Sequence, residues 1–145
     1  MEVESQGAET EWRGLMVAGP LDEQGSTLKM RGTLLPDDKW HYVGESGEPS
    51  FENSWVNYDT ATFAAARFIK DASGVVHIEG LVKSGTVPET IFTLPEGYRP
   101  TQENLLTVQQ SNTGVARLDI LPEGDVYANT GGNGWFSIHV SFYVG

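Results

Sequence analysis

The chain has 145 residues, 39% of them hydrophobic and 20% charged, which leaves room for one ordinary domain with or without an extension. Seventeen glycines and seven prolines are typical of short strands joined by tight turns, and the lack of cysteine excludes disulfides and thiolate metal sites. A net charge of −11 without a basic stripe argues against nucleic acid and membrane surfaces as partners, and no apolar run is long enough for membrane insertion.

Residues 1–50 mix polar stretches with short apolar pieces at 12–17 and 27–34. The second piece alternates apolar and polar residues over its first five positions, which predicts a half-buried strand. Residues 44–50 are a loop by composition and form the predicted boundary. We therefore expect an N-terminal segment, 1–50, that serves for docking and oligomerisation, and an outer domain, 51–145.

Two strands at 62–70 and 75–83 flank a Gly-containing turn, which predicts a β-hairpin. Three alanines in the first strand also fit a short helix on propensity, but its length and the strand that follows favour β. Further strands are predicted at 89–93, 104–110, 115–121 and 125–129.

The last predicted strand, 135–144, has the clearest alternation. Bulky residues from Phe136 to Val144 occupy every second position, so we expect a core strand at the centre of its sheet. The whole pattern predicts an all-β fold, an antiparallel β-sandwich or barrel. The size of the domain favours a homo-oligomer.

Catalytic and cofactor motifs are not found. His41, His77 and His139 lie on separate segments without metal-ligand spacing, and no Gly-x-Ser-x-Gly motif is present. The acids cluster at turns, whereas a glycosidase needs two carboxylates facing each other across a sugar. The Gly-rich loop at 131–134 lacks the lysine and helix of a phosphate-binding loop. We expect a protein that is not an enzyme and has no cofactor and no metal.

Residues 94–100 (Leu-Pro-Glu-Gly-Tyr-Arg-Pro) form a predicted rigid corner, because two prolines and a glycine restrict the backbone. Tyr98 and Arg99 are then held in fixed positions. They either contact a ligand or a neighbouring subunit, or they are structural, with Tyr98 packed down and Arg99 paired with a carboxylate.

The run 91–100 (Ile-Phe-Thr-Leu-Pro-Glu-Gly-Tyr-Arg-Pro) resembles a segment of C-terminal domains in tail-fibre, minor tail and receptor-binding proteins of tailed bacteriophages. Companion motifs are similar to the same family in the same order, at 40–44, 47–57, 67–76 and 124–126. The resemblance covers about residues 40–145.

The resemblance implies a jelly-roll-like antiparallel β-sandwich that forms a homotrimer at the outer end of a virion appendage and binds host-surface saccharide. Residues 1–39 match no known pattern, so by elimination they are expected to attach the protein to other virion proteins. Because the chain is short and lacks a shaft, a capsid decoration or head-fibre protein is the alternative to a short tail fibre or spike. The expected location is the virion, either at the tail tip or on the capsid surface.

Candidate saccharide-binding residues are aromatic side chains with polar neighbours, since sugars stack on rings and hydrogen-bond at their edges. Tyr127, Asn129, Asn133 and Trp135 surround the Gly-rich loop and are the first choice. The alternative for Tyr127 and Trp135 is core or inter-subunit packing, which these residue types favour over saccharide contact. A small polysaccharide-degrading enzyme remains as the rival class of function.

Overall fold

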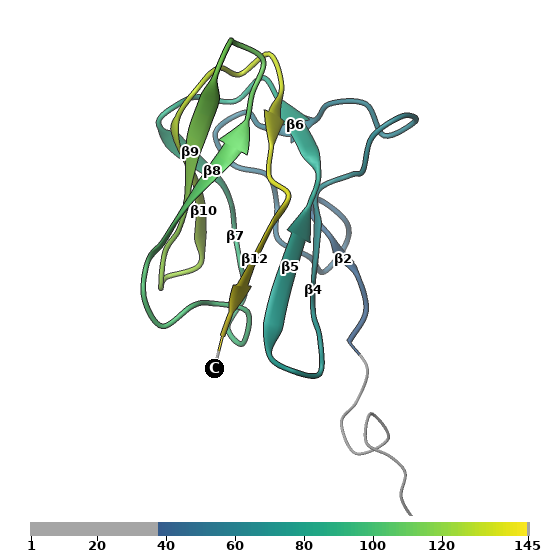
Figure 1. Ribbon diagram of the computed structural model, residues 1–145. Helices are drawn as coiled ribbons and strands as arrows, with labels where there is room; N and C mark the ends of the chain where they lie inside the picture. Colours follow the sequence, from purple (N-terminus) through teal and green to yellow (C-terminus); the bar gives the residue numbers. More distant parts are fainter. Residues whose placement is uncertain (1–37, 145) are drawn as a thin grey trace, which may run out of the picture. The chain divides into compact units, whose positions relative to one another are not determined.

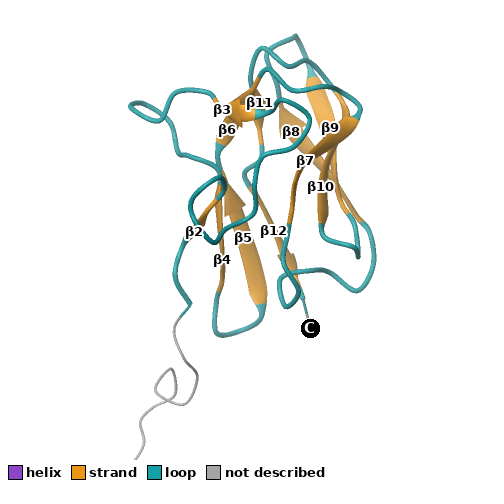
Figure 2. Ribbon diagram, turned by 180° about the vertical axis from the view of Figure 1, so that it is seen from behind, coloured by secondary structure: helices purple, strands orange, loops and turns teal. Residues whose placement is uncertain are grey.

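The computed structural model describes residues 38–144, and every regular element in this range is a β-strand (Figures 1 and 2). None of the described residues belongs to a helix that is long and apolar enough to span a membrane. Residues 1–37 lie outside the described residues, and with them the predicted strand at 27–34 and most of the segment 1–39 that is expected to attach the protein to other virion proteins.

The strands pair into antiparallel sheets, which confirms the all-β antiparallel prediction. Two four-stranded sheets have the orders β7-β10-β9-β8 and β12-β5-β4-β2, and a smaller sheet has the order β11-β6-β3. The strands are β2 (His41–Tyr42), β3 (Val56–Asn57), β4 (Arg67–Lys70), β5 (Val75–Glu79), β6 (Leu81–Lys83), β7 (Glu89–Thr93), β8 (Asn104–Gln109), β9 (Val115–Ile120), β10 (Asp125–Thr130), β11 (Phe136–Ser137) and β12 (Val140–Tyr143).

The predicted hairpin is present between β4 and β5, where Phe68 pairs with Ile78 and Lys70 with Val76. Gly74 has a φ of 92° and its N–H donates to Asp71 O, so the glycine supplies the positive φ that the turn needs. The strand begins at Arg67 rather than at residue 62. Residues 59–63 form a turn instead, because Asp59 accepts the N–H groups of Ala61 and Phe63.

The predicted strand at 75–83 is divided by Gly80, which has a φ of 147°. A Cβ at Gly80 would lie 2.7 Å from Ala66 Cα, so only glycine fits the close approach of the two backbones. Directly across, the N–H of Ile138 donates to Gly80 O, and the predicted strand at 135–144 is divided there into β11 and β12. The two breaks are therefore one bend in two paired strands.

The alternation predicted for 135–144 is confirmed, since Phe136, Ile138, Val140 and Phe142 are all buried. Its predicted central place is wrong, because β12 is an end strand of its sheet and pairs only with β5 within the sheet order.

All three sheets contribute to one cluster of buried side chains. Its largest members are Trp55, Phe68, Phe92 and Phe136, each at most 1% exposed. In Figure 1 the strands β7 to β10 gather on one side of the domain, and β2, β4, β5 and β12 on the other. Residues 38–50 belong to the same unit as the later strands, since His41 and Tyr42 pair with Phe68 and Arg67 of β4.

Candidate functional site

A groove of about 720 Å³ opens between β2, the loop after β2 and the segment that joins β3 to β4. Its volume is within the range of small-molecule sites in proteins, about 300–1,000 Å³. Three aromatic rings line it together with small apolar and polar residues; the lining residues are Tyr42, Val43, Gly44, Glu45, Phe51, Asn57, Thr60, Phe63, Ala64, Ala65 and Arg67.

The loop after β2 is shaped by backbone hydrogen bonds within the loop itself. The Gly44 N–H donates to Pro49 O at 2.7 Å, and the Glu48 N–H donates to Glu45 O at 3.0 Å. Gly44 and Gly47 both have positive φ, 92° and 81°, which glycine adopts without strain. The loop is therefore a closed turn that holds its lining residues in place.

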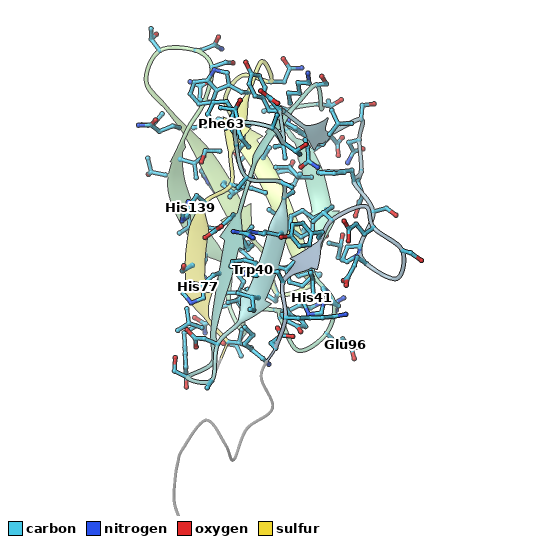
Figure 3. The ribbon with its side chains drawn as sticks, turned by 90° about the vertical axis from the view of Figure 1, so that its right-hand side faces the viewer. Trp40, His41, Phe63, His77, Glu96 and His139 are labelled. Carbon is cyan, nitrogen blue, oxygen red and sulfur yellow. The ribbon has the colours of Figure 1, made fainter. Side chains whose placement is uncertain are left out.

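Phe63 lies in the segment between β3 and β4, on the side of the domain that Figure 3 views. Its N–H donates to Asp59 O at 2.9 Å, and its ring meets the Tyr58 ring edge-on, with 5.7 Å between centroids. The side chain is 46% exposed despite these contacts. An aromatic ring that is positioned on one side and open to solvent on the other is suited to stacking on a ligand.

Arg67 provides the positive charge of the groove lining, but its donors are engaged. Its Nη2 donates to Glu79 Oε1 at 2.7 Å, and its Nη1 donates to Tyr42 Oη at 3.0 Å. Its guanidinium also lies 4.0 Å from the centroid of the Trp40 ring. The hydrogen bond to Glu79 outweighs partial burial and raises the pKa of Arg67 above its ordinary value.

The other polar groups of the groove lining come from Asn57, Thr60 and Glu45. Asn57 Oδ1 accepts the N–H of Ala66 at 2.8 Å, which fixes the direction of the amide. Thr60 and Glu45 are exposed. Rings with hydroxyl, amide and carboxylate groups beside them can bind a pyranose, whose faces are apolar and whose edge carries hydroxyls.

Behind Tyr42, the neighbouring residue His41 is held between two carboxylates. His41 Nε2 lies 2.9 Å from Asp38 Oδ1, and His41 Nδ1 lies 3.0 Å from both oxygens of Glu48. The Tyr98 hydroxyl donates to Asp38 Oδ2 at 2.9 Å, and the Lys70 N–H reaches the same oxygen at 3.0 Å. We call Asp38, His41, Glu48 and Tyr98 the His41 clamp.

The clamp favours a protonated imidazole. Burial pulls the pKa of His41 down, but the hydrogen bonds to Asp38 and Glu48 outweigh it and raise the pKa. Burial also opposes ionisation of Asp38, yet its hydrogen bonds with Lys70, His41 and Tyr98 lower its pKa to about 2. Burial and the nearby carboxylate raise the pKa of Tyr98 to about 12, so the phenol remains a donor.

A second histidine cluster lies on the exposed face of β5 and β12. His77 Nδ1 is 2.9 Å from Ser141 Oγ, and His77 Nε2 is 2.8 Å from Asp71 Oδ2. This order of groups is that of a Ser–His–Asp triad, but acyl transfer also needs oxyanion donors and a substrate cleft. His77 and Asp71 are about 40% exposed, and none of the three residues lines the groove. We interpret the cluster as an anchor for the β4–β5 hairpin, where Asp71 also accepts the N–H groups of Ser73 and Val75.

The four residues predicted to bind saccharide lie away from the groove. Tyr127 and Asn129 are in β10, on the face opposite the buried Val126 and Ala128, and the Asn129 amide donates to Asp119 at 3.0 Å. Asn133 and Trp135 follow in the loop to β11, where the Asn133 amide donates to Gly85 O at 2.8 Å. None of the four lines the groove, and saccharide contact at these residues stays a prediction.

The corner at 94–100 is anchored at both of its predicted contact residues. Tyr98 packs edge-on against Phe68, with 5.1 Å between ring centroids, in addition to its bond to Asp38. The Arg99 Nε donates to Leu94 O at 2.8 Å, so its hydrogen bond closes the corner itself. A contact of these residues with another subunit stays a prediction.

The residues of the groove were not predicted from the sequence as a site. One signal was available, since the motif at 47–57 places aromatic residues in a segment that contains Gly, Pro and Ser rather than in an alternating strand. Aromatic side chains in turns cannot all enter the core, so some of them must line a surface. What the sequence did not show is that Phe63 and Arg67 complete the same groove.

In comparisons with known proteins, no family model matches the chain, and no curated protein or solved structure is significantly similar to it.

Proposed function

We propose that this protein is a non-catalytic adhesion protein that binds a saccharide in the groove between β2 and the β3–β4 segment. The observation that carries the proposal is the exposed ring of Phe63, held by Tyr58 and Asp59, within a groove lined by aromatic and polar residues. Stacking on such a ring and hydrogen bonding at its edge is how proteins recognise sugars without a metal or a cofactor.

Binding is favoured over hydrolysis by the carboxylates of the groove. Among the described residues that line it, Glu45 is the one acid, and it is exposed. A glycosidase places two carboxylates on opposite sides of the scissile bond and raises the pKa of one of them. The polysaccharide-degrading alternative therefore receives no support from this groove.

The proposal includes a place for the protein on the virion of a tailed phage, as a short tail fibre, spike or receptor-binding subunit. Its support is the resemblance of residues 40–145, described above. In this proposal the β-domain is a jelly-roll-like sandwich in a homotrimer, so that three weakly binding grooves act together on a host surface. Residues 1–50 supply the contact to other virion proteins.

A glycan array and titration of its strongest ligands test the binding activity. Phe63→Ala removes the exposed ring, and we expect at least a tenfold loss of affinity. Leu105→Ala is the matched control, because Leu105 is also an exposed large apolar residue, 57% accessible, but it lies on β8 outside the groove. Binding that survives Phe63→Ala, or an array without any ligand, would refute the proposed site.

The virion part has its own test. Gold-labelled antibody on intact particles should mark the tail tip, whereas labelling of the capsid would identify the protein as a decoration or head fibre. Release of oligosaccharides from host cell-wall polysaccharide by the purified protein would refute the non-catalytic part of the proposal.

A further inference from the structure

The positive charge of the groove is already neutralised inside the protein. Arg67 and Glu79 form an ion pair with 2.7 Å between Nη2 and Oε1, and both side chains are 26% exposed. Trp40 covers the guanidinium, at 4.0 Å from its ring centroid, and Tyr42 accepts a further hydrogen bond. An anionic ligand would have to compete with Glu79 for donors that are fixed by three neighbours.

The remaining charge of the groove is negative. Arg67 is the one cation and Glu45 the one anion among the described lining residues. Because Glu79 offsets Arg67, the described lining offers no unpaired cation to an anionic ligand, and the carboxylate of Glu45 adds a negative charge. The chain as a whole has a net charge of −11, which adds a repulsive background for any anion.

On the basis of the proposed saccharide binding, we propose that the groove selects uncharged pyranosides and rejects acidic ones, such as uronic acids, sialic acids and phosphorylated sugars. An uncharged sugar places an apolar face on Phe63 and hydroxyls near the Asn57 amide and Thr60. It displaces no ion pair and meets no like charge. A sugar with an ammonium group is not repelled by Glu45. Because that carboxylate is exposed, solvent weakens its attraction for an ammonium group and its repulsion of a carboxylate alike, so the missing free cation is the main obstacle to an anionic sugar.

Three oligosaccharides of different charge test the selection: an N-acetylglucosamine trisaccharide, its deacetylated form with ammonium groups, and a hyaluronan tetrasaccharide with carboxylates, whose binding at high salt controls for its different length and linkage. Their affinities are measured by NMR titration or calorimetry at low and high salt. We expect the carboxylated ligand to bind at least tenfold more weakly than the N-acetylated one at low salt, with a smaller difference at high salt. The deacetylated ligand should lie within a few-fold of the N-acetylated one.

Three variants test whether residues in and beside the groove cause the weaker binding of the carboxylated ligand. Glu79→Gln keeps the shape of the side chain but releases the charge of Arg67, and we expect it to reduce the discrimination against carboxylate at least threefold. Glu45→Gln should also reduce the discrimination against carboxylate, because it removes a negative charge that repels the ligand. It leaves the ion pair of Arg67 and Glu79 intact. Glu96→Gln is the control, since it removes the same unit of charge from an exposed position outside the groove, labelled in Figure 3.

The outcomes separate this inference from the proposed function. If none of the three saccharides and no other glycan binds, the proposed function fails. If the carboxylated ligand binds as tightly as the N-acetylated one, the protein binds saccharide but the selection by charge is refuted. The same conclusion follows if Glu96→Gln changes the discrimination as much as Glu79→Gln and Glu45→Gln do.

Discussion

Gly85 is a buried residue without a side chain, and a methyl group at this position should strongly destabilise the domain. A Cβ built there lies closer than 3.0 Å to three atoms of the Trp55 indole, a separation that real Cβ contacts essentially never show. Trp55 is 1% exposed and packs edge-on against Phe136, with 5.7 Å between ring centroids. The ring therefore has no free space into which it can withdraw.

The size of the effect follows from this packing. Carbon atoms at their optimal separation are about 3.5–4.0 Å apart, so the indole must shift by more than about 0.5 Å inside the core. Overpacking of this kind costs typically about 1–3 kcal/mol, and we expect Gly85→Ala to reach about 3 kcal/mol. For a domain of this size, that loss lowers Tm by about 12 °C or more.

Urea unfolding followed by circular dichroism measures the change in free energy of unfolding. Gly97→Ala is the control, because nothing lies within 4 Å of its added Cβ and only the positive φ of 91° opposes the methyl group. In a Trp55→Leu background the smaller side chain should relieve the clash, so Gly85→Ala should cost at least 1 kcal/mol less than in the natural sequence, taking about 3 kcal/mol as its full cost. A loss below about 0.5 kcal/mol in the natural sequence, or an equal loss in both backgrounds, would refute the reasoning.

Three further predictions concern the stability effects of changes at His41, Asp119 and Gly124. Because the pKa of His41 is raised in the folded state, its contribution to stability is complete below the ordinary value of 6.5 and is lost as pH rises through the folded pKa. The free energy of unfolding should therefore fall as pH rises above the ordinary value of 6.5, and His41→Gln should remove this fall; an unchanged pH profile in the variant would contradict the prediction. Asp119→Ala leaves the Asn129 amide without its acceptor at a cost of about 1–3 kcal/mol, whereas Asp119→Asn, which retains an acceptor, should cost less in the same urea assay. Gly124→Ala places a Cβ 2.5 Å from Leu94 O at a φ of 103°, so we expect a loss of about 3 kcal/mol, and a Tm within 2 °C of the natural protein would count against it.

Much of the strand pattern could be predicted because alternation is a local signal. The range 89–93 was predicted with the bounds of β7, and 115–121 and 125–129 were within one residue of β9 and β10. The bend that divides 75–83 and 135–144 was not predicted. It depends on the approach of Gly80 to Ala66 and to Ile138, and such long-range contacts leave no periodic trace in a single sequence.

The candidate site was harder to predict because it consists of turns and of very short strands. β2 and β3 have two residues each and are strands only by virtue of their partners β4 and β6. The His41 clamp joins residues 38, 41, 48 and 98, and the chain gives no sign that residue 98 returns to this place. The predicted saccharide residues 127 and 129 were chosen for their type, but their strand lies in a different sheet from β2 and β4.

The two residues of β2 have different surroundings, since His41 is part of the clamp while Tyr42 lines the groove. β2 is the last strand of its sheet and makes few backbone contacts, and short end strands open locally at a lower free energy than central strands. Each opening would remove one wall of the groove, and with the proposed binding the apparent affinity for a saccharide would fall by the fraction of molecules that are open. With the proposed binding, a stronger clamp would raise the affinity by keeping β2 paired, without touching the ligand, and hydrogen exchange at the Val43 amide would report the opening directly.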